Sequence, residues 1–419
     1  MARFAYALLL YLITPLIGLR LLWRARKQPE YLLHLAERFG FYRQPTPLGL
    51  IWVHAVSVGE TRAAQPLIEG LLARWPGHRI LLTGMTPTGR ATGQQIYGER
   101  VIQAYLPYDY PGAVRRFFRH FSPAFGVLME TEIWPNLLAA AKAHDVPVVL
   151  VNARLSQRSA RGYGKLDRLV RPAFAALTGV VAQTASDAER LLALGASRVE
   201  VCGNLKFDVS PATELVALGT QWRAAIGQRP IWLAASTREG EEALVLDAWR
   251  EVRQPGALLV LVPRHPQRFA EVAALLDQQG RRSVCRSAGL PAADTEVWLG
   301  DSMGEMAAYF TLADLAFIGG SLLPLGGQNL IEAAACGCPV LIGPHTFNFL
   351  QATNDAIAAG AARRVADALA LGQAVAALLR EPGDLAAMRQ AAREFSAAHQ
   401  GAAQRTLEVI ARWLGRAGR

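Results

Sequence analysis

The chain has 419 residues, too many for one ordinary core and enough for two domains. Its composition, 52% hydrophobic and 19% charged, is typical of a packed globular protein and excludes a disordered chain. The formal net charge of +10 predicts an anionic partner, which leaves phospholipid, nucleic acid and acidic substrates open. Four dispersed cysteines are too few for a disulfide framework or a zinc site, so we expect structural thiols in a reducing compartment.

The N-terminal residues from Phe4 to Trp23 are almost continuously apolar. As a helix rising about 1.5 Å per residue, this run just reaches across a ~30 Å hydrocarbon core. A secretory signal peptide is the alternative, but no small-x-small cleavage site follows. The basic cluster Arg24 to Lys27 instead predicts a cytoplasmic body by the positive-inside rule. We expect residues 1–28 to be a membrane anchor, with shallow insertion left open by Pro15 and Arg20.

Residues 29–209 alternate short apolar strands with helical segments, which predicts a doubly wound parallel sheet. We expect strands at 51–56, 80–83, 125–129, 146–151, 180–182 and 199–202. Polar turns follow the strands, at the edge where open α/β sheets hold their ligands. These turns are Thr83–Arg90, Glu130–Asn136, Asn152–Ser156 and Gly203–Asp208.

Glu60 lies in the first helical turn after the strand at 51–56 and the small-residue loop Ser57–Gly59. A carboxylate in a first turn commonly does no more than complement the helix dipole, and taken alone this is the more frequent reason for one. The carboxyl end of a parallel strand is also where a catalytic acid or base would stand. The local pattern by itself leaves both interpretations open.

The second half of the chain repeats the α/β pattern after a linker at 210–230 that contains one short amphipathic helix around Trp222. We expect strands at 231–235, 258–262, 315–318 and 340–342 in a domain covering 231–383. Ser236 and Glu239 have the spacing of a capping box, which predicts a helix starting after Ser236. Residues 384–419 form an Ala- and Arg-rich helical segment, which we expect to be a solvated surface helix.

A glycine-rich stretch, Gly326 to Asn329, precedes a predicted helix. Exposed backbone N–H groups and a helix dipole there would form a phosphate cradle, although an ordinary glycine-rich turn remains the alternative. Glu332, one turn into that helix, could reach ribose hydroxyls. The sequence has no dinucleotide fingerprint, Walker A motif, HExxH or Asp-x-Asp. We therefore expect no cofactor, no metal and a leaving group that needs no divalent ion.

Several blocks of sequence, in the same order, resemble the 3-deoxy-D-manno-octulosonic acid (Kdo) transferases of lipopolysaccharide assembly. The blocks are 52–60, 130–136, 152–156, 203–208, 263–266, 304–306 and 319–349. The resemblance covers nearly the whole chain, including the N-terminal anchor. It implies a GT-B fold, an α/β architecture in which two Rossmann-like domains face each other across a cleft, one binding the acceptor and the other CMP. It also implies CMP-Kdo as donor, lipid IV(A) as acceptor and a place on the cytoplasmic face of the bacterial inner membrane.

The resemblance also implies roles for individual residues. Glu60 is expected to be the general base, with Glu130 and Lys206 stabilising the transition state. The CMP site is expected at Pro263, Arg264, Gly304, Glu305, Met306, Asn329, Leu330, Ile331 and Glu332. The chemistry agrees, because inverting glycosyl transfer needs one carboxylate to deprotonate the acceptor hydroxyl. Arg264, Lys206 and a helix N-terminus can neutralise the departing phosphate without metal. Glu132 we expect to be structural.

Three other functions compete with this one. A GT-B transferase or epimerase using a UDP-sugar stays within the same enzyme class. A protein that only binds anionic membrane surfaces would explain the positive charge. It would not explain the polar residues that follow the predicted strands. Nucleic-acid binding is disfavoured, because the arginines are dispersed and no RNA- or DNA-binding motif is present.

Overall fold

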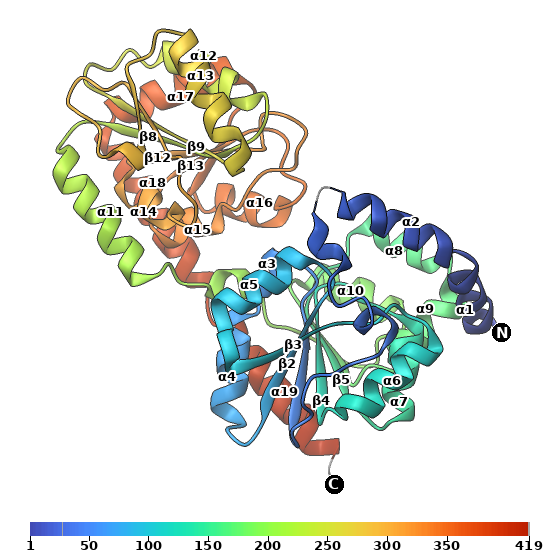
Figure 1. Ribbon diagram of the computed structural model, residues 1–419. Helices are drawn as coiled ribbons and strands as arrows, with labels where there is room; N and C mark the ends of the chain where they lie inside the picture. The colour runs from blue at the N-terminus through green and yellow to red at the C-terminus, as the bar shows by residue number, and fades with distance from the viewer. Residues whose placement is uncertain (27, 418–419) are drawn as a thin grey trace. The chain divides into compact units, whose positions relative to one another are not determined.

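The computed structural model describes residues 1–26 and 28–417, which divide into two compact units (Figure 1). Unit 1 comprises Met1–Val209 and Gly401–Arg419, and unit 2 comprises Ser210–Gln400. Each unit is built on a seven-stranded sheet whose strand pairs are all parallel. The two α/β halves predicted from the sequence are confirmed.

The sheet of unit 1 has the order β3-β2-β1-β4-β5-β6-β7. Its strands are β1 (Leu50–His54), β2 (Arg79–Gly84), β3 (Val101–Tyr105), β4 (Phe125–Met129), β5 (Val148–Ala153), β6 (Gly179–Ala182) and β7 (Val199–Val201). The strand order reverses between β1 and β4, which pair directly. Such a reversal opens a crevice beyond the carboxyl ends of the strands, where ligands of doubly wound sheets bind.

Helices cover both faces of this sheet. They are α3 (Val58–Ala63), α4 (Gln65–Arg74), α5 (Pro87–Tyr97), α6 (Pro111–Phe121), α7 (Pro135–Ala143), α8 (Gln157–Gly164), α9 (Asp167–Ala175), α10 (Ala185–Ala193) and α19 (Ala402–Ala417). Short 3₁₀ turns add η1 (Pro29–Leu32), η2 (Glu37–Phe39), η3 (Gly98–Arg100) and η4 (Leu205–Asp208). Because side chains alternate along a strand, Trp52 packs with Phe117 and Phe118 of α6 on one face. Ile51 and Val53 join the opposite cluster, with α4 and α19.

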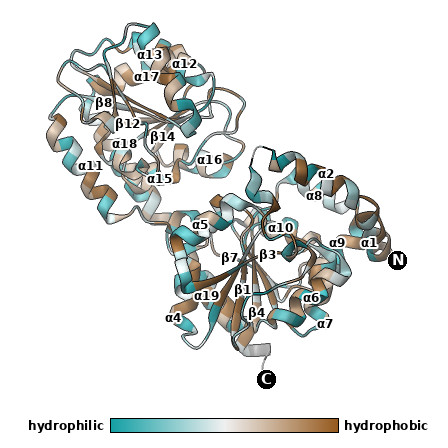
Figure 2. Cartoon of the chain, in the orientation of Figure 1, coloured by the Kyte–Doolittle hydropathy of each residue, from teal (hydrophilic) through white to brown (hydrophobic). Residues whose placement is uncertain are grey.

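The sheet of unit 2 has the order β10-β11-β9-β8-β12-β13-β14. Its strands are β8 (Ile231–Thr237), β9 (Leu258–Pro263), β10 (Ser283–Cys285), β11 (Val297–Leu299), β12 (Leu315–Ile318), β13 (Val340–Ile342) and β14 (Ala362–Arg364). Its helices are α11 (Thr213–Ile226), α12 (Glu241–Glu251), α13 (Phe269–Gln278), α14 (Met306–Leu312), α15 (Ile331–Ala335), α16 (Leu350–Ala358), α17 (Ala368–Arg380) and α18 (Pro382–His399), with 3₁₀ turns η5 (Pro266–Arg268) and η6 (Arg286–Ala288). In both units the central strands are hydrophobic, while the helices carry mixed faces (Figure 2).

The prediction missed four strands, namely β3, β10, β11 and β14. The last three have three residues each, too few to show a period, and β3 is interrupted by Gln103. The capping box at Ser236 is wrong, because β8 continues through Thr237 and α12 begins only at Glu241, after Gly240. The carboxylate of Glu241, not that of Glu239, accepts the N–H of Arg238 at 3.0 Å.

The segment at 210–230 is more than a linker, because α11 packs against α14 and its Trp222 is buried on Trp298 and Tyr309. Residues 384–419 also differ from the expected surface helix. They are divided between α18, in unit 2, and α19, in unit 1. Trp413 of α19 is only 4% exposed and lies where a Cβ on Gly179 would come within 2.3 Å of its ring.

The N-terminal apolar run forms two helices, α1 (Ala2–Leu12) and α2 (Thr14–Ala25), bent by 49°. Among the described residues no single helix has the length and apolarity to cross a membrane, whereas this bent pair together has both. The break falls just before Pro15, which lacks the N–H needed to continue the helical ladder. Tyr11 stacks on Tyr110 with ring centroids 5.0 Å apart, and Thr14 hydrogen-bonds the Tyr110 hydroxyl at 2.8 Å. Of the predicted basic flank, Lys27 lies outside the described residues.

The burial of Trp413 predicts that α19 is part of the core of unit 1. Trp413→Ala should lower the free energy of unfolding by about 3–5 kcal/mol, since it removes a large buried aromatic side chain. The neighbouring Arg412→Ala, which removes an exposed ion pair to Glu200, should cost less than ~1 kcal/mol. Urea unfolding followed by circular dichroism measures both. Equal effects of the two substitutions would show that α19 is not part of the core.

Candidate active site

Glu60 is held in place by the loop that connects β1 to α3. Ser57 caps α3, with its Oγ 3.4 Å from the N–H of Glu60, and its hydroxyl donates to Oε1 of Glu60 at 2.8 Å. The N–H of Val56 donates to Oε2 at 2.9 Å. Both carboxylate oxygens are thus engaged, and the side chain is only partly exposed.

Burial raises the pKa of Glu60 from its ordinary value of 4.5 to about 7. The hydrogen bonds from Val56 and Ser57 lower this pKa, and the negative charges of Glu130 and Glu132 raise it. A carboxylate with a pKa near the working pH can both accept a proton and release it again. The site around Glu60 is therefore suited to general-base chemistry.

Glu130 and Lys206 form an ion pair beside this carboxylate. The Lys206 Nζ lies 3.0 Å from Oε1 of Glu130, and each side chain is 27% exposed. Glu130 follows β4 with φ +59°, a left-handed conformation that costs a non-glycine residue free energy. Its N–H donates to the Val151 carbonyl at 2.9 Å, which fixes that conformation. The three residues predicted to be catalytic thus belong to one unit, with the charge of Glu130 acting on Glu60.

The position of Lys206 depends on two asparagines that the sequence analysis did not single out. Asn152, the second-last residue of β5, has φ +53°, and its Oδ1 accepts the N–H of Leu205 at 3.0 Å. Asn204 Oδ1 accepts the N–H of Lys206 at 3.0 Å. The carboxylate of Asp208 then accepts the N–H of Gly401 at 2.6 Å, which fastens η4 to the start of α19. Both asparagines lie in the polar turns found in the sequence. The Asn204 contact is local, two residues along the chain, whereas the contacts of Asn152 and Asp208 join distant segments and leave no local pattern.

Glu132 has a mainly structural environment. Its Oε2 accepts the indole N–H of Trp134 at 2.5 Å. Burial raises its pKa, the Trp134 hydrogen bond lowers it, and the charge of Glu130 raises it. Its negative charge nevertheless contributes to the high pKa of Glu60.

In unit 2 the residues predicted to bind CMP lie near the carboxyl ends of β9 and β11 and at the start of α15. Arg264 follows β9, its side chain exposed, with its N–H donating to the Thr237 carbonyl at 2.9 Å. Its Nε donates to Oε1 of Gln328 at 3.3 Å, which places Arg264 beside the glycine-rich loop. Burial and the nearby cations of Arg238 and Arg264 lower the pKa of His265.

The glycine-rich loop differs from a simple cradle of free N–H groups. Gly326 and Gly327 adopt φ of +95° and +75°, as the prediction of a glycine-dependent turn requires. The N–H of Gly327 donates to the Gly320 carbonyl at 2.7 Å, and that of Gln328 to the Gly319 carbonyl at 3.0 Å. These two donors are used within the protein, and α15 has only five residues. The loop is thus a rigid support for the exposed Asn329, whose Oδ1 accepts the N–H of Ile331 at 3.1 Å.

The other predicted CMP residues divide into buried and accessible positions. Three of them are buried in unit 2, namely Pro263, Leu330 and Ile331. Glu305 pairs with Arg286 at 3.1 Å and accepts the Ser302 hydroxyl. Those placed at or near the surface are Gly304, Met306 and Glu332.

One important carboxylate in unit 2 was missed by sequence analysis. Glu241 is fully buried, and besides Arg238 it accepts the N–H groups of Gly320 at 2.5 Å and Leu322 at 3.0 Å. It thereby ties the loop after β12 to the start of α12. Because these partners are about eighty positions away along the chain, no local spacing could reveal them.

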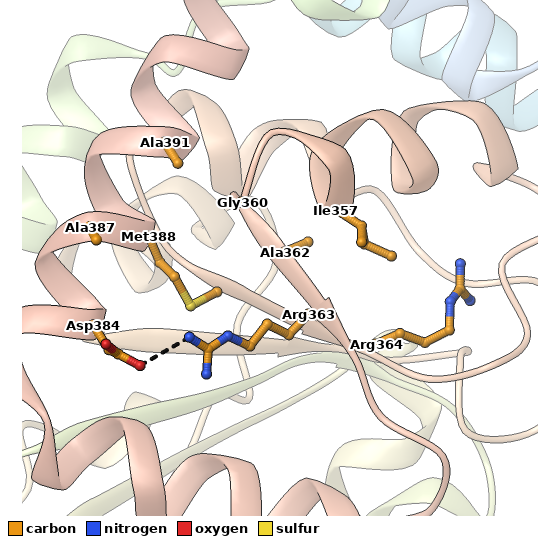
Figure 3. Close-up of a pocket in the computed structure, with 9 residues that line it drawn as sticks. All are labelled: Ile357, Gly360, Ala362, Arg363, Arg364, Asp384, Ala387, Met388 and Ala391. Atoms are coloured by element: carbon orange, nitrogen blue, oxygen red, sulfur yellow. Dashed lines mark hydrogen bonds and ion pairs between the residues drawn. The ribbon is translucent and has the colours of Figure 1, made fainter.

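A cavity of about 680 Å³ in unit 2 lies elsewhere, along β14, α16 and α18 (Figure 3). Arg363 and Asp384 form an ion pair of 3.0 Å in its wall, and none of the predicted site residues lines it. Within residues 1–26 and 28–417 no group of three or more His, Cys, Asp or Glu side chains is placed to hold a metal ion.

Comparison with known sequences decides the family. A model described as 3-deoxy-D-manno-octulosonic-acid transferase (kdotransferase) matches residues 33–209. The 3-deoxy-D-manno-octulosonic acid transferase of Bordetella pertussis is 48% identical, over 99% of this chain and all of its own length. The chain belongs to the Kdo transferase family. It is thus a glycosyltransferase, as the motifs predicted.

Two solved structures show that this Kdo transferase has a GT-B-like fold. A glycosyltransferase from Rickettsia africae has a TM-score of 0.59 and 14% identity, covering 87% of this chain and 98% of its own. The UDP-GlcNAc 2-epimerase of Neisseria meningitidis bound to UDP-GlcNAc has a TM-score of 0.60 and 15% identity, covering 87% of this chain and all of its own. At such identities the likeness concerns the fold alone, and the fold does not decide the donor.

The raised pKa of Glu60 predicts a pH-dependent stability for this Kdo transferase. A carboxyl group with a raised pKa favours the folded state below its unfolded value of 4.5, and this contribution is lost as the pH rises through about 7. The free energy of unfolding of the wild type, minus that of Glu60→Gln, should therefore fall by on the order of 3 kcal/mol between these limits. Urea unfolding of both proteins at a series of pH values measures it. A difference that does not change with pH would contradict the assignment.

Proposed function

We propose that this protein transfers Kdo from CMP-Kdo to lipid IV(A) with inversion, and that Glu60 is the general base. The observation that supports this most strongly is the environment of Glu60: a partly buried carboxylate with a pKa of about 7, held by two donors beside the Glu130–Lys206 pair. Membership of the Kdo transferase family identifies Kdo as the sugar that is transferred. The donor nucleotide and the lipid acceptor follow from the motifs.

In the proposed reaction the acceptor hydroxyl oxygen attacks the anomeric carbon of Kdo while its proton passes to a carboxylate oxygen of Glu60. The bond from that carbon to the phosphate oxygen of CMP breaks, and CMP leaves with the electron pair. A positioned base typically contributes ~10²–10⁴ in rate. No separate nucleophile on the protein is needed, because inversion takes one displacement.

The Glu130–Lys206 pair is proposed to stabilise the charges of the transition state. The Lys206 ammonium suits either the departing phosphate or the carboxylate of the octulosonic acid, both of which are anionic. Glu130 keeps this cation in place at 3.0 Å and adds negative charge near Glu60, which strengthens Glu60 as a base. The proposal thus assigns proton transfer and charge stabilisation to unit 1.

The contacts to CMP are proposed to come from unit 2. Arg264 supplies a guanidinium for the phosphate, and Glu332 supplies a carboxylate for ribose hydroxyls. Gly304, Met306 and Asn329 line the surface through which the nucleotide would approach. Pro263, Glu305, Leu330 and Ile331 act by holding these residues in place, since they are buried or already engaged.

The proposal predicts strict use of CMP-Kdo. Purified protein should transfer Kdo from CMP-Kdo to lipid IV(A) and should not transfer sugars from UDP donors. Glu60→Gln, which keeps the size of the side chain but cannot accept the proton, should lower turnover by ~10²–10⁴ while CMP affinity stays unchanged. Product formation and CMP binding are measured on the same preparations. Transfer from a UDP-sugar would favour the competing function, and near-normal turnover of Glu60→Gln would remove Glu60 as the base.

We further propose that the α1–α2 pair binds the cytoplasmic face of the bacterial inner membrane. Its large apolar side chains are unusually exposed, including Leu9 at 56%, Leu16 at 64% and Leu19 at 63%. Exposed apolar side chains on an amphipathic or spanning helix are stabilised by a bilayer, and nearby arginines suit anionic lipid. Tyr11 and Thr14 fasten the pair to unit 1 through Tyr110.

Replacing Leu9, Leu16 and Leu19 together by Glu tests this membrane surface without removing core side chains. The variant should stay folded and lose co-sedimentation with vesicles containing anionic phospholipid, because three charges cannot enter the hydrocarbon. Leu369→Glu, an equally exposed leucine of unit 2, is the control and should bind like the wild type. Unchanged vesicle binding of the triple variant would place the membrane contact elsewhere.

A further inference from the structure

Thr86 lies in the turn between β2 and α5, a polar turn that the proposed mechanism leaves without a role. It caps α5, since its Oγ1 accepts the N–H of Gly89 at 3.1 Å. Its hydroxyl hydrogen is directed elsewhere, to the carbonyl oxygen of Val56 at 3.2 Å. The hydroxyl therefore accepts one hydrogen bond from its own helix and donates another to the loop between β1 and α3.

Val56 connects this hydroxyl with the carboxylate of Glu60. Its carbonyl accepts from Thr86, and its N–H donates to Oε2 of Glu60 at 2.9 Å. The same loop is fixed one residue earlier, where the N–H of Ala55 donates to the Thr83 carbonyl at 2.9 Å. The orientation of Val56, and with it the donor to Glu60, thus depends on the end of β2 and on the turn that follows it.

The start of α5 approaches this loop very closely. A Cβ on Gly89 would lie 2.9 Å from Oγ1 of Thr86 and 3.3 Å from the carbonyl oxygen of Val56. A Cβ at this helical position would therefore crowd both the Thr86 hydroxyl and the Val56 carbonyl. The helix and the loop are therefore in direct contact, and the Thr86 hydroxyl is the polar link between them.

We propose that Thr86 is a positioning residue for Glu60: its hydroxyl holds the Val56 peptide so that the Val56 N–H donates to the Glu60 carboxylate. Thr86 touches no reacting atom in this role. It acts through one backbone hydrogen bond on the proton affinity of the base. The inference rests on the proposed function of Glu60.

The other charged and titratable groups around Glu60 do not replace this contact. Glu130 and Glu132 act on Glu60 through their charges, and the cation of Lys206 is paired with Glu130. On α5, the Tyr97 hydroxyl donates to the Thr61 carbonyl at 2.8 Å and Arg90 pairs with Glu37 at 2.9 Å. On α4, Glu69 pairs with Arg100, and η4 adds Asp208, engaged with Gly401. The Glu60 carboxylate accepts hydrogen bonds from the Ser57 hydroxyl and the Val56 N–H.

The test is the pH dependence of kcat/KM for Kdo transfer by the full-length protein, using CMP-Kdo and lipid IV(A). The hydrogen bond from Val56 lowers the pKa of Glu60, so its weakening makes the carboxylate harder to deprotonate. Thr86→Val should move the acid limb of the profile to higher pH by ~0.5–1 pH unit. At pH values below the limb, kcat/KM should therefore fall three- to tenfold, and it should recover at higher pH. Thr86→Ser keeps the hydroxyl and should leave the limb where it is in the wild type.

Two further variants keep the test decisive. Thr184→Val removes a comparable threonine cap, which accepts the Asp187 N–H at 3.1 Å at the start of α10, and should leave the limb in place. Gly89→Ala crowds Oγ1 of Thr86 from within α5 and should move the limb in the same direction as Thr86→Val, which provides an answer even if Thr86→Val does not fold.

The inference is overturned if Thr86→Val loses activity equally at all pH values, as a general loss of stability would produce, or if Thr86→Ser moves the limb as far as Thr86→Val does. Glu60→Gln, measured in the same series, separates this result from the proposed function. If Glu60→Gln is inactive and the limb of Thr86→Val does not move, only the role of Thr86 fails. If Glu60→Gln is fully active, the base itself has been assigned wrongly.

Discussion

The balance between burial and hydrogen bonding at the carboxylate of Glu60 is the constraint on which the site depends. Burial alone would protonate this side chain, and full solvation would make it a weak base. Hydrogen bonds from the Val56 N–H and the Ser57 hydroxyl lower the pKa of Glu60 and so offset part of the rise caused by burial. The negative charges of Glu130 and Glu132 raise this pKa further. The resulting pKa of about 7 requires that all these groups keep fixed positions, which the central strands of unit 1 provide.

Fixed positions at the strand ends come with backbone strain. Glu130, Asn152 and Ser236 are non-glycine residues in the left-handed region, each next to or within the carboxyl end of a central strand. Such a conformation costs about 1–3 kcal/mol per residue. The buried strands tolerate it because their cores are fully packed, as the zero exposure of Val53, Val127 and Val151 shows. Strain at these positions redirects the chain, so that the Glu130 carboxylate pairs with Lys206 and the Asn152 amide accepts the N–H of Leu205.

The sequence was sufficient to predict the two α/β halves, because continuous apolar runs such as Phe125–Met129 end in polar turns. Glu60, Glu130 and Lys206 were predicted to be catalytic from their motifs, and the structure places the charge of Glu130 close to both of the others. The contacts that tune them could not be predicted. The Thr86 hydroxyl and the Asn152 amide bind backbone groups 30 and 53 positions away along the chain. The core position of α19 was hidden in the same way, since its Ala- and Arg-rich composition resembles a surface helix until Trp413 meets Gly179.

Catalysis by the proposed mechanism depends most directly on the protonation of Glu60 in the free enzyme. The pH dependence of kcat/KM for Kdo transfer from CMP-Kdo to lipid IV(A) measures it, because this parameter reports the ionisation of the free enzyme and its free substrates. We expect the wild-type protein to lose activity below a pH of about 7 with the slope of a single proton, since burial raises the pKa of Glu60 to that value. A wild-type profile that stays level down to about 5, near the ordinary pKa of a glutamate, would contradict it.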